Sequence, residues 1–217
     1  MLAQDHILFF RSSIKENVTM FRDVNDFWKL ENLSRRPGDL VIIGSGFLGA
    51  ELAYALGERS KENPELKVSQ ICRESGVLGA VLPRHLSDYA SEAIEQSGVN
   101  VVRNAEIESV TKNEKIEINL TDGRKVPADH VVLAVGVDID TSIAKKSGLE
   151  YDPHRGGFIV NSELESRRDV YVAGDAANFF DIRLGRRRVE HYDHVSHRNT
   201  YPYQIIFLGN CHRSTCR

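Results

Sequence analysis

The sequence is poor in cysteine and has no long hydrophobic run. Its 217 residues include three cysteines, Cys72, Cys211 and Cys216, an odd and sparse number that suits a reducing compartment and gives no disulfide framework. Cys211 and Cys216 flank His212, but the fourth ligand of a structural zinc site is missing, so we expect no metal site. Because no apolar run reaches the roughly 18 residues that a bilayer requires, we also expect no membrane span.

The composition is that of a soluble globular protein with a small negative charge. Hydrophobic residues make up 41% and charged residues 27%, the formal net charge is -3, and the length allows one or two domains with a buried core. The opening residues, MLAQDHILFFRSSIKEN, contain some arginine, serine and lysine but also Asp5, so they give no clear targeting peptide.

Apolar strands alternate with amphipathic helices between residues 38 and 137. We expect strands at residues 40–43, 66–72, 100–103 and 130–135, and helices at residues 48–61 and 83–96, with Pro83 as an early helical residue. Segments that alternate apolar with polar residues, at 106–110, 115–120 and 125–127, predict a β-meander. The order predicts an α/β fold: a doubly wound Rossmann-type domain with a β-meander inserted before its last strand.

The segments on either side of this domain carry weaker patterns. The spacing of Val24, Phe27, Trp28 and Leu30 predicts a helix before the first strand. After the domain we expect a short helix at residues 141–147 and two strands at residues 158–161 and 170–173. From Val195 onward no period is sustained, so that stretch is predicted to be an atypical tail.

The stretch VIIGSGFLGAEL, residues 41–52, carries a GxGxxG motif between a predicted strand and a predicted helix. Gly44 permits a sharp turn, Gly46 lets the backbone approach a pyrophosphate, and Gly49 lets the helix pack close to the strand. The start of the helix then offers N–H groups and the positive end of its dipole to a phosphate. An ordinary glycine turn is the alternative, but the βαβ context favours a dinucleotide site.

Glu74 follows the second predicted strand, where an acidic residue accepts hydrogen bonds from an adenosine ribose and repels a 2′-phosphate. It therefore favours NAD over NADP. Arg73 beside it points the other way, because an arginine at this place is a usual sign of NADP.

The stretch RRDVYVAGDAAN, residues 167–178, is a second candidate for nucleotide contact. Asp175 at the end of an apolar strand can reach a sugar or ribityl hydroxyl, while the following N–H groups approach a phosphate. A plain turn is the alternative. The position of this stretch, after a GxGxxG domain and a meander, favours the nucleotide interpretation.

Several stretches together resemble the apoptosis-inducing factor family of mitochondrial flavoprotein NADH oxidoreductases. They are IIGSGFLGAELAYALG, AVLPRHLSDYA, DGRKVPADHVVLAVG and GGFIVNSELESRRDVYVAGDAANFFDIRLGRRRVEHYDH, of which the last is the most specific. The resemblance covers roughly residues 18–194.

This resemblance implies both cofactors, FAD and NAD, and a role for each matching residue. Glu51 would lie beside the flavin, and Glu190 and His191 near the nicotinamide and flavin rings, which makes Glu51 and His191 the catalytic candidates. The matching FAD contacts are Arg22 and Asp175, and the matching NAD contacts are Ser45, Gly46, Phe47, Leu48, Glu74 and Gly136.

The resemblance also divides the chain. Residues 1–37 would be a residual N-terminal segment of the FAD domain and residues 38–137 the NAD domain. Residues 138–194 would be the C-terminal part of the FAD domain, and residues 195–217 a divergent tail. The family has a second GxGxxG in its FAD domain, and this sequence has none, so we expect a truncated form with impaired flavin binding. Ala80 stands where the family has an NAD-contacting lysine, and Tyr192 replaces a histidine.

A basic loop offers a different function. In the family, the loop matching Arg183, Arg186, Arg187 and Arg188 is associated with nuclear import and nucleic-acid contact, which makes a non-catalytic protein- or DNA-binding module the alternative. Because the chain is acidic overall, we expect at most weak DNA binding. The resemblance also implies the mitochondrial intermembrane space, nuclear translocation, a cell-death role, and a dimer or protein partners. A disulfide reductase would need a CxxC-type motif, which the sequence lacks.

Overall fold

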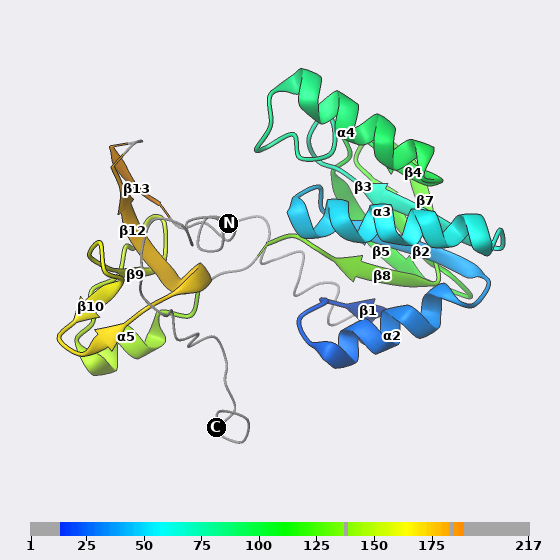
Figure 1. Ribbon diagram of the computed structural model, residues 1–217. Helices are drawn as coiled ribbons and strands as arrows, with labels where there is room; N and C mark the ends of the chain where they lie inside the picture. The colour runs from blue at the N-terminus through cyan, green and yellow to red at the C-terminus, as the bar shows by residue number, and fades with distance from the viewer. Residues whose placement is uncertain (1–13, 137–138, 183–184, 189–217) are drawn as a thin grey trace. The chain divides into compact units, whose positions relative to one another are not determined.

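The computed structural model describes residues 14–136, 139–182 and 185–188, which fall into two compact units (Figure 1). The first unit is Met1–Gly136 and the second is Val137–Arg217.

The first unit is built on a five-stranded parallel sheet in the order β1-β8-β2-β3-β4. Its central strand β2 shows why the sheet is buried on both faces, because successive side chains point to opposite sides. Leu40 and Ile42 enter one apolar cluster, and Val41 and Ile43 enter the other. The strands are β1 (Val18–Thr19), β2 (Gly38–Ile43), β3 (Leu66–Ile71), β4 (Val99–Val102) and β8 (His130–Leu133).

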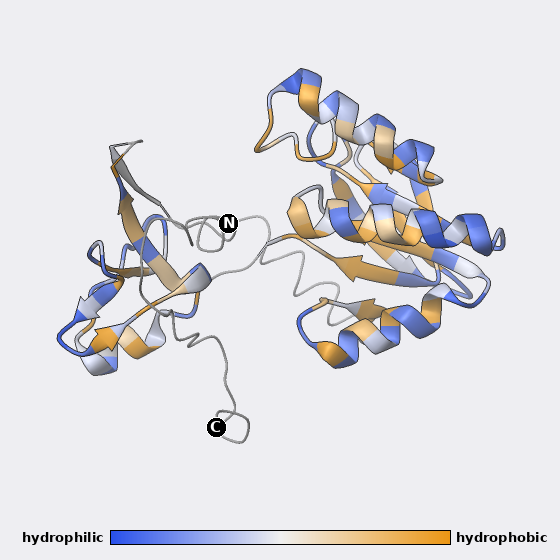
Figure 2. Ribbon diagram, viewed as in Figure 1, coloured by the Kyte–Doolittle hydropathy of each residue, from blue (hydrophilic) through white to orange (hydrophobic). Residues whose placement is uncertain are grey.

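Helices cover one face of this sheet and a meander covers the other. Leu30, Leu56 and Ile94 place α2 (Val24–Ser34), α3 (Phe47–Glu62) and α4 (Arg84–Gln96) on the first face. Apolar and polar residues alternate along α3 and α4 (Figure 2). Val110, Ile118 and Val126 bring the antiparallel sheet β5-β6-β7 onto the second face. Its strands are β5 (Ile107–Lys112), β6 (Ile116–Leu120) and β7 (Lys125–Ala128).

The predicted elements all occur, with ends that differ by a few residues. One local prediction was wrong: Pro83 is the N-cap of α4, and the helix begins at Arg84. The reason is visible in its backbone, because ψ of 151° at Pro83 is extended and not helical.

The described residues before Gly38 pack onto this same unit. A short 3₁₀ turn, η1 (Lys15–Asn17), leads into β1, which pairs with β8 at the sheet edge. In α2 the side chain of Asp23 caps the helix by accepting hydrogen bonds from two backbone N–H groups. Glu31 of α2 then accepts a hydrogen bond at 2.7 Å from Arg59 of α3. The assignment of residues 1–37 to an FAD domain stays a prediction.

The second unit is small and its strands are short. Phe158, Val160 and Ala177 are buried in it. Its strands form two sheets, in the orders β13-β12-β9 and β10-β11. The strands expected at residues 158–161 and 170–173 occur as β9 and β11, and each is only two residues long. The elements are α5 (Ser142–Ser147), β9 (Phe158–Ile159), β10 (Glu165–Arg167), β11 (Val170–Tyr171), η2 (Gly174–Ala176), β12 (Ala177–Asp181) and β13 (Arg186–Arg188).

Candidate nucleotide-binding site

The GxGxxG motif forms the tight turn from β2 into α3. Gly44 has a φ of +119°, and a Cβ there would lie 2.3 Å from the carbonyl oxygen of Ala134 on the neighbouring strand end. A Cβ on Gly49 would lie 2.3 Å from the carbonyl oxygen of Gly44. A Cβ on Gly46 would meet nothing within 4 Å. The fold therefore requires glycine at positions 44 and 49, and Gly46 borders open space; its role at a pyrophosphate stays a prediction.

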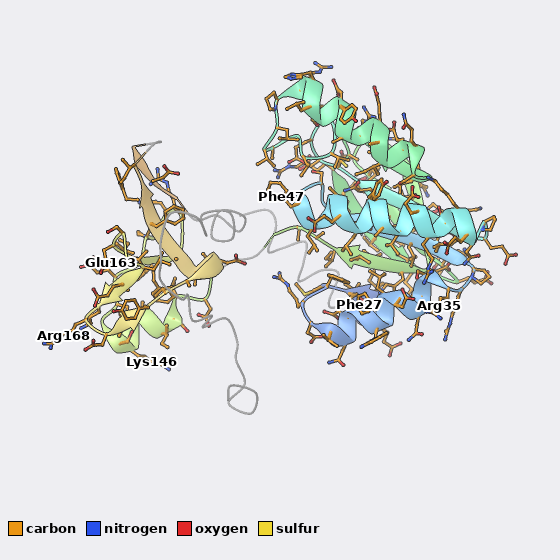
Figure 3. The ribbon with its side chains drawn as sticks, viewed as in Figure 1. Phe27, Arg35, Phe47, Lys146, Glu163 and Arg168 are labelled. Carbon is orange, nitrogen blue, oxygen red and sulfur yellow. The ribbon has the colours of Figure 1, made fainter. Side chains whose placement is uncertain are left out.

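The N-terminus of α3 is well suited to an anion. Gly46 is the N-cap and supplies no side-chain hydrogen bond to the first turn of this 16-residue helix. The positive end of the helix dipole lies at the same place. Phe47 and Leu48, in the first turn, are 40% and 36% exposed, and Figure 3 shows Phe47 at the tip of the helix.

Glu74 is held beside this turn in its charged form. The hydroxyl of Ser45 donates a hydrogen bond of 2.6 Å to Oε2 of Glu74, and Arg73 Nη2 lies 3.3 Å from Oε1. Burial alone would raise the pKa of Glu74, but the hydrogen bond from Ser45 and the nearby Arg73 guanidinium outweigh it and hold that pKa below its usual value. Arg73 itself is 72% exposed.

The remaining candidates of the first unit follow neighbouring parallel strands at the same edge of the sheet. Arg22 comes after β1 and Gly136 after β8, and Arg22 Nη2 donates to the carbonyl oxygen of Gly136 at 3.1 Å. Because carboxyl ends of parallel strands share one edge, the structure gathers Arg22, the glycine turn, Glu74 and Gly136 along it.

A loop after β3 reaches this edge as well. The N–H of Leu78 donates to the carbonyl oxygen of Ser45 at 2.7 Å, which ties residues 76–82 to the glycine turn. Ala80 is exposed in this loop.

The other candidates lie further along α3, in the second unit or outside the described residues. Glu51 is exposed on α3, and Asp175 lies in η2 of the second unit. Arg186, Arg187 and Arg188 form β13, paired with β12. Arg183, Glu190 and His191 lie outside the described residues. The cofactor and nucleic-acid roles of all these residues stay predictions.

One residue at the site was missed from the sequence. Gln70 of β3 is fully buried, and its Nε2 donates to the carbonyl oxygen of Gly44 at 2.9 Å. The available signal was an amide two positions after Val68 and two before Cys72, on a strand face that is otherwise apolar. In the described ranges no group of three His, Cys, Asp or Glu residues is placed to hold a metal ion.

These features are typical of a dinucleotide-binding protein: a parallel sheet, a glycine turn, a helix N-terminus suited to an anion, and an ionised acid after the next strand. The chain belongs to the pyridine nucleotide-disulphide oxidoreductase family, which it matches over residues 9–197. The fold class predicted from the sequence, Rossmann-type α/β, is confirmed.

Within this family the resemblance to apoptosis-inducing factor is confirmed by two relatives. The chain is 44% identical over 183 residues to the Drosophila melanogaster protein named as a mitochondrial apoptosis-inducing factor 1, covering 84% of this chain and 25% of the relative. It is 42% identical over 193 residues to the Dictyostelium discoideum apoptosis-inducing factor 1, covering 87% of this chain and 36% of the relative.

A solved structure supports the same family. The NAD-dependent persulfide reductase from A. fulgidus superposes with a TM-score of 0.70 at 26% identity, covering 82% of this chain and 32% of that one. The chain thus spans about a third or less of the length of these relatives. The family and its reductase relatives use FAD and NAD(P)H. No helix among the described residues is both long and apolar enough to cross a membrane.

Proposed function

We propose that this chain binds NAD(H) at the carboxyl edge of its parallel sheet. The observation that carries the proposal is the ionised Glu74, fixed by Ser45 beside the open space at Gly46. In this arrangement a carboxylate and a helix N-terminus are presented together, as adenosine ribose and pyrophosphate require.

The residues present give the bound dinucleotide an orientation. The pyrophosphate meets the N–H groups at the start of α3, and the ribose hydroxyls donate to Glu74. A 2′-phosphate would meet the same charged carboxylate, so NADH binds more tightly than NADPH. Arg73 weakens this preference without reversing it, because its exposed guanidinium is screened by solvent.

At the scale of the whole relatives, we propose hydride transfer from NADH to FAD. The flavin supplies the electron acceptor when it is bound. Arg22 and Asp175 would contact it, Glu51 would lie beside it, and Glu190 and His191 would hold the nicotinamide near it. This chain lacks a second GxGxxG, so its own flavin affinity is weakened relative to full-length relatives.

The finer biological roles rest on resemblance. The two relatives named as mitochondrial apoptosis-inducing factors support a mitochondrial protein with a part in cell death. The intermembrane space, nuclear translocation and a dimer belong to the same proposal. DNA contact through the arginine loop remains the alternative, and salt-sensitive binding lost on replacing Arg186–Arg188 by alanine would favour it.

Calorimetric titration with NADH tests the proposed binding. The informative variant is Gly46→Val, because a Cβ at this position meets nothing within 4 Å and the side chain would enter the space proposed for the ligand. We expect NADH binding to be abolished while the thermal unfolding temperature changes little. Wild-type protein that shows no heat of binding with NADH would contradict the proposal.

Glu74→Ala gives the matched test of cofactor choice. Removing the carboxylate takes away the ribose acceptor and the repulsion of a 2′-phosphate. The ratio of NADH to NADPH affinity should therefore fall toward or below one. An unchanged ratio would show that Glu74 does not face the ribose.

A further inference from the structure

Gln70 occupies a position in β3 where an apolar side chain would be expected. It is fully buried, and its strand neighbours on the same face, Val68 and Cys72, belong to the apolar cluster beneath the helices. Among the described residues its Oε1 atom has no hydrogen-bond partner. Burying an unpaired amide oxygen costs stability, so this side chain is poorly explained by packing alone.

The other end of the amide is bonded to the glycine turn. Nε2 of Gln70 donates to the carbonyl oxygen of Gly44 at 2.9 Å. That carbonyl belongs to the peptide bond between Gly44 and Ser45, which is planar and trans, like every described peptide bond. In a trans peptide the C=O and the following N–H point in opposite directions. A carbonyl drawn toward the buried amide therefore turns the Ser45 N–H away from the core.

The same carbonyl fixes the helix. A Cβ on Gly49 would lie 2.3 Å from the Gly44 oxygen and 3.4 Å from Nε2 of Gln70. The amide, the carbonyl and the Cα of Gly49 thus form one close contact between β3, the turn and α3. One hydrogen bond sets both the direction of the Ser45 peptide and the position of the helix end.

We propose that Gln70 is a positioning residue for the phosphate site: it holds the Gly44–Ser45 peptide so that the Ser45 N–H faces the bound pyrophosphate. This inference rests on the proposed binding of NAD(H). Gln70 touches no ligand itself and acts only through the turn. Its amide is retained at a cost in stability because the phosphate site needs this peptide orientation.

Gln70→Met tests the proposal because methionine has a similar length and no donor. We expect the dissociation constants of NADH and ADP-ribose to rise about ten-fold, as when a hydrogen bond that orients a phosphate donor is lost. The weak binding of adenosine, measured by ligand-observed NMR, should be the same in Gln70→Met as in the wild type, since adenosine carries no phosphate. The thermal unfolding temperature should change little, because removing the unpaired Oε1 offsets the loss of the donor to the Gly44 carbonyl oxygen.

A spectroscopic signature separates positioning from general loosening. In the wild type, ADP-ribose should shift the Ser45 amide proton in an NMR spectrum, and in Gln70→Met this shift should be lost. Val68→Ala is the matched control, because it removes core methyl groups from the same strand face. It should lower stability and leave the ADP-ribose dissociation constant within about two-fold of wild type.

Three outcomes overturn the proposal. A folded Gln70→Met variant that binds ADP-ribose within about two-fold of wild type overturns it while leaving NAD(H) binding intact. If Gln70→Met does not fold, a wild-type Ser45 amide that does not respond to bound ADP-ribose overturns it. Wild-type protein that binds neither NADH nor ADP-ribose overturns this inference and the proposed function together.

Discussion

Burial decides the charge state of individual residues in the first unit. Cys72 is fully buried, which raises the pKa of its thiol to about 12, so it is neutral and a poor nucleophile at ordinary pH. Burial also lowers the pKa of His130 to about 4, with a smaller contribution from Lys29. Glu74 differs from both, because hydrogen bonding keeps its carboxylate charged. A carboxylate that is held ionised at a strand end can accept hydrogen bonds from a ligand.

His130 predicts a dependence of stability on pH. Its ring Nε2 lies 2.8 Å from the Thr19 hydroxyl, and its pKa of about 4 in the folded chain compares with an ordinary value of 6.5. The unfolded chain therefore binds the extra proton between these values. The free energy of unfolding should fall as pH drops from about 6.5 to about 4, by up to about 3 kcal/mol from this residue.

Urea unfolding at pH 7.5 and pH 4.5 measures this effect, and His130→Gln is the control. The glutamine variant keeps a polar partner for Thr19 and cannot take up the proton, so its stability should vary less with pH. Equal losses in both proteins would assign the acid sensitivity to carboxylates instead.

At the scale of elements, the site is made by strand ends rather than by any single strand or helix. β1, β8, β2 and β3 run parallel, so residues that are far apart in sequence reach one edge. The loop at residues 76–82 is tied to the same edge through Leu78 and Ser45. This loop also contains Ala80, at a position where the resemblance to apoptosis-inducing factor implies a lysine.

Ala80→Lys should strengthen NADH binding. An added ammonium group in the loop tied to the phosphate turn can reach the ligand's negative charge, and a charged contact at an exposed site is expected to improve affinity roughly two- to five-fold. Asn113→Lys is the control, because it adds the same charge at an exposed position in the β5–β6 turn. The gain should shrink at high salt and be absent in the control. Equal gains in both variants would indicate a general charge effect.

At the scale of the whole molecule, the candidate flavin contacts are divided between two units. Arg22 lies in the first and Asp175 in the second. Under the proposed function a flavin would also need a phosphate-binding turn, and this sequence contains no second GxGxxG. The proposed NAD(H) site uses residues of the first unit alone, so we expect the two cofactors to behave differently in the purified chain.

The absorbance spectrum of the purified chain tests this difference. After purification we expect little or no flavin absorbance band in the blue part of the visible spectrum. When FAD is added to the purified chain, dialysis should remove it again. NADH binding should survive the same dialysis. A protein that retains FAD at one equivalent would refute the expected impairment.

The sequence predicted the parallel core, the meander and the glycine turn, because each depends on local patterns of period two, period 3.6 or glycine spacing. It missed contacts that depend on long-range pairing. The two-residue strand β1 is too short to show a pattern and exists because it pairs with β8. The bond from Arg22 to Gly136 likewise requires two strand ends to meet.

By itself the sequence determined that this chain is a Rossmann-type α/β protein with a dinucleotide turn and an acidic residue after the next strand. Those features follow from residue types whose physical requirements are local. The tertiary structure decided that the helices share one face of the sheet. It also decided that Ser45 donates a hydrogen bond to Glu74 and that the buried Gln70 donates one to the glycine turn. These arrangements depend on which side chains meet across separate strands, and that is settled only when the sheet forms.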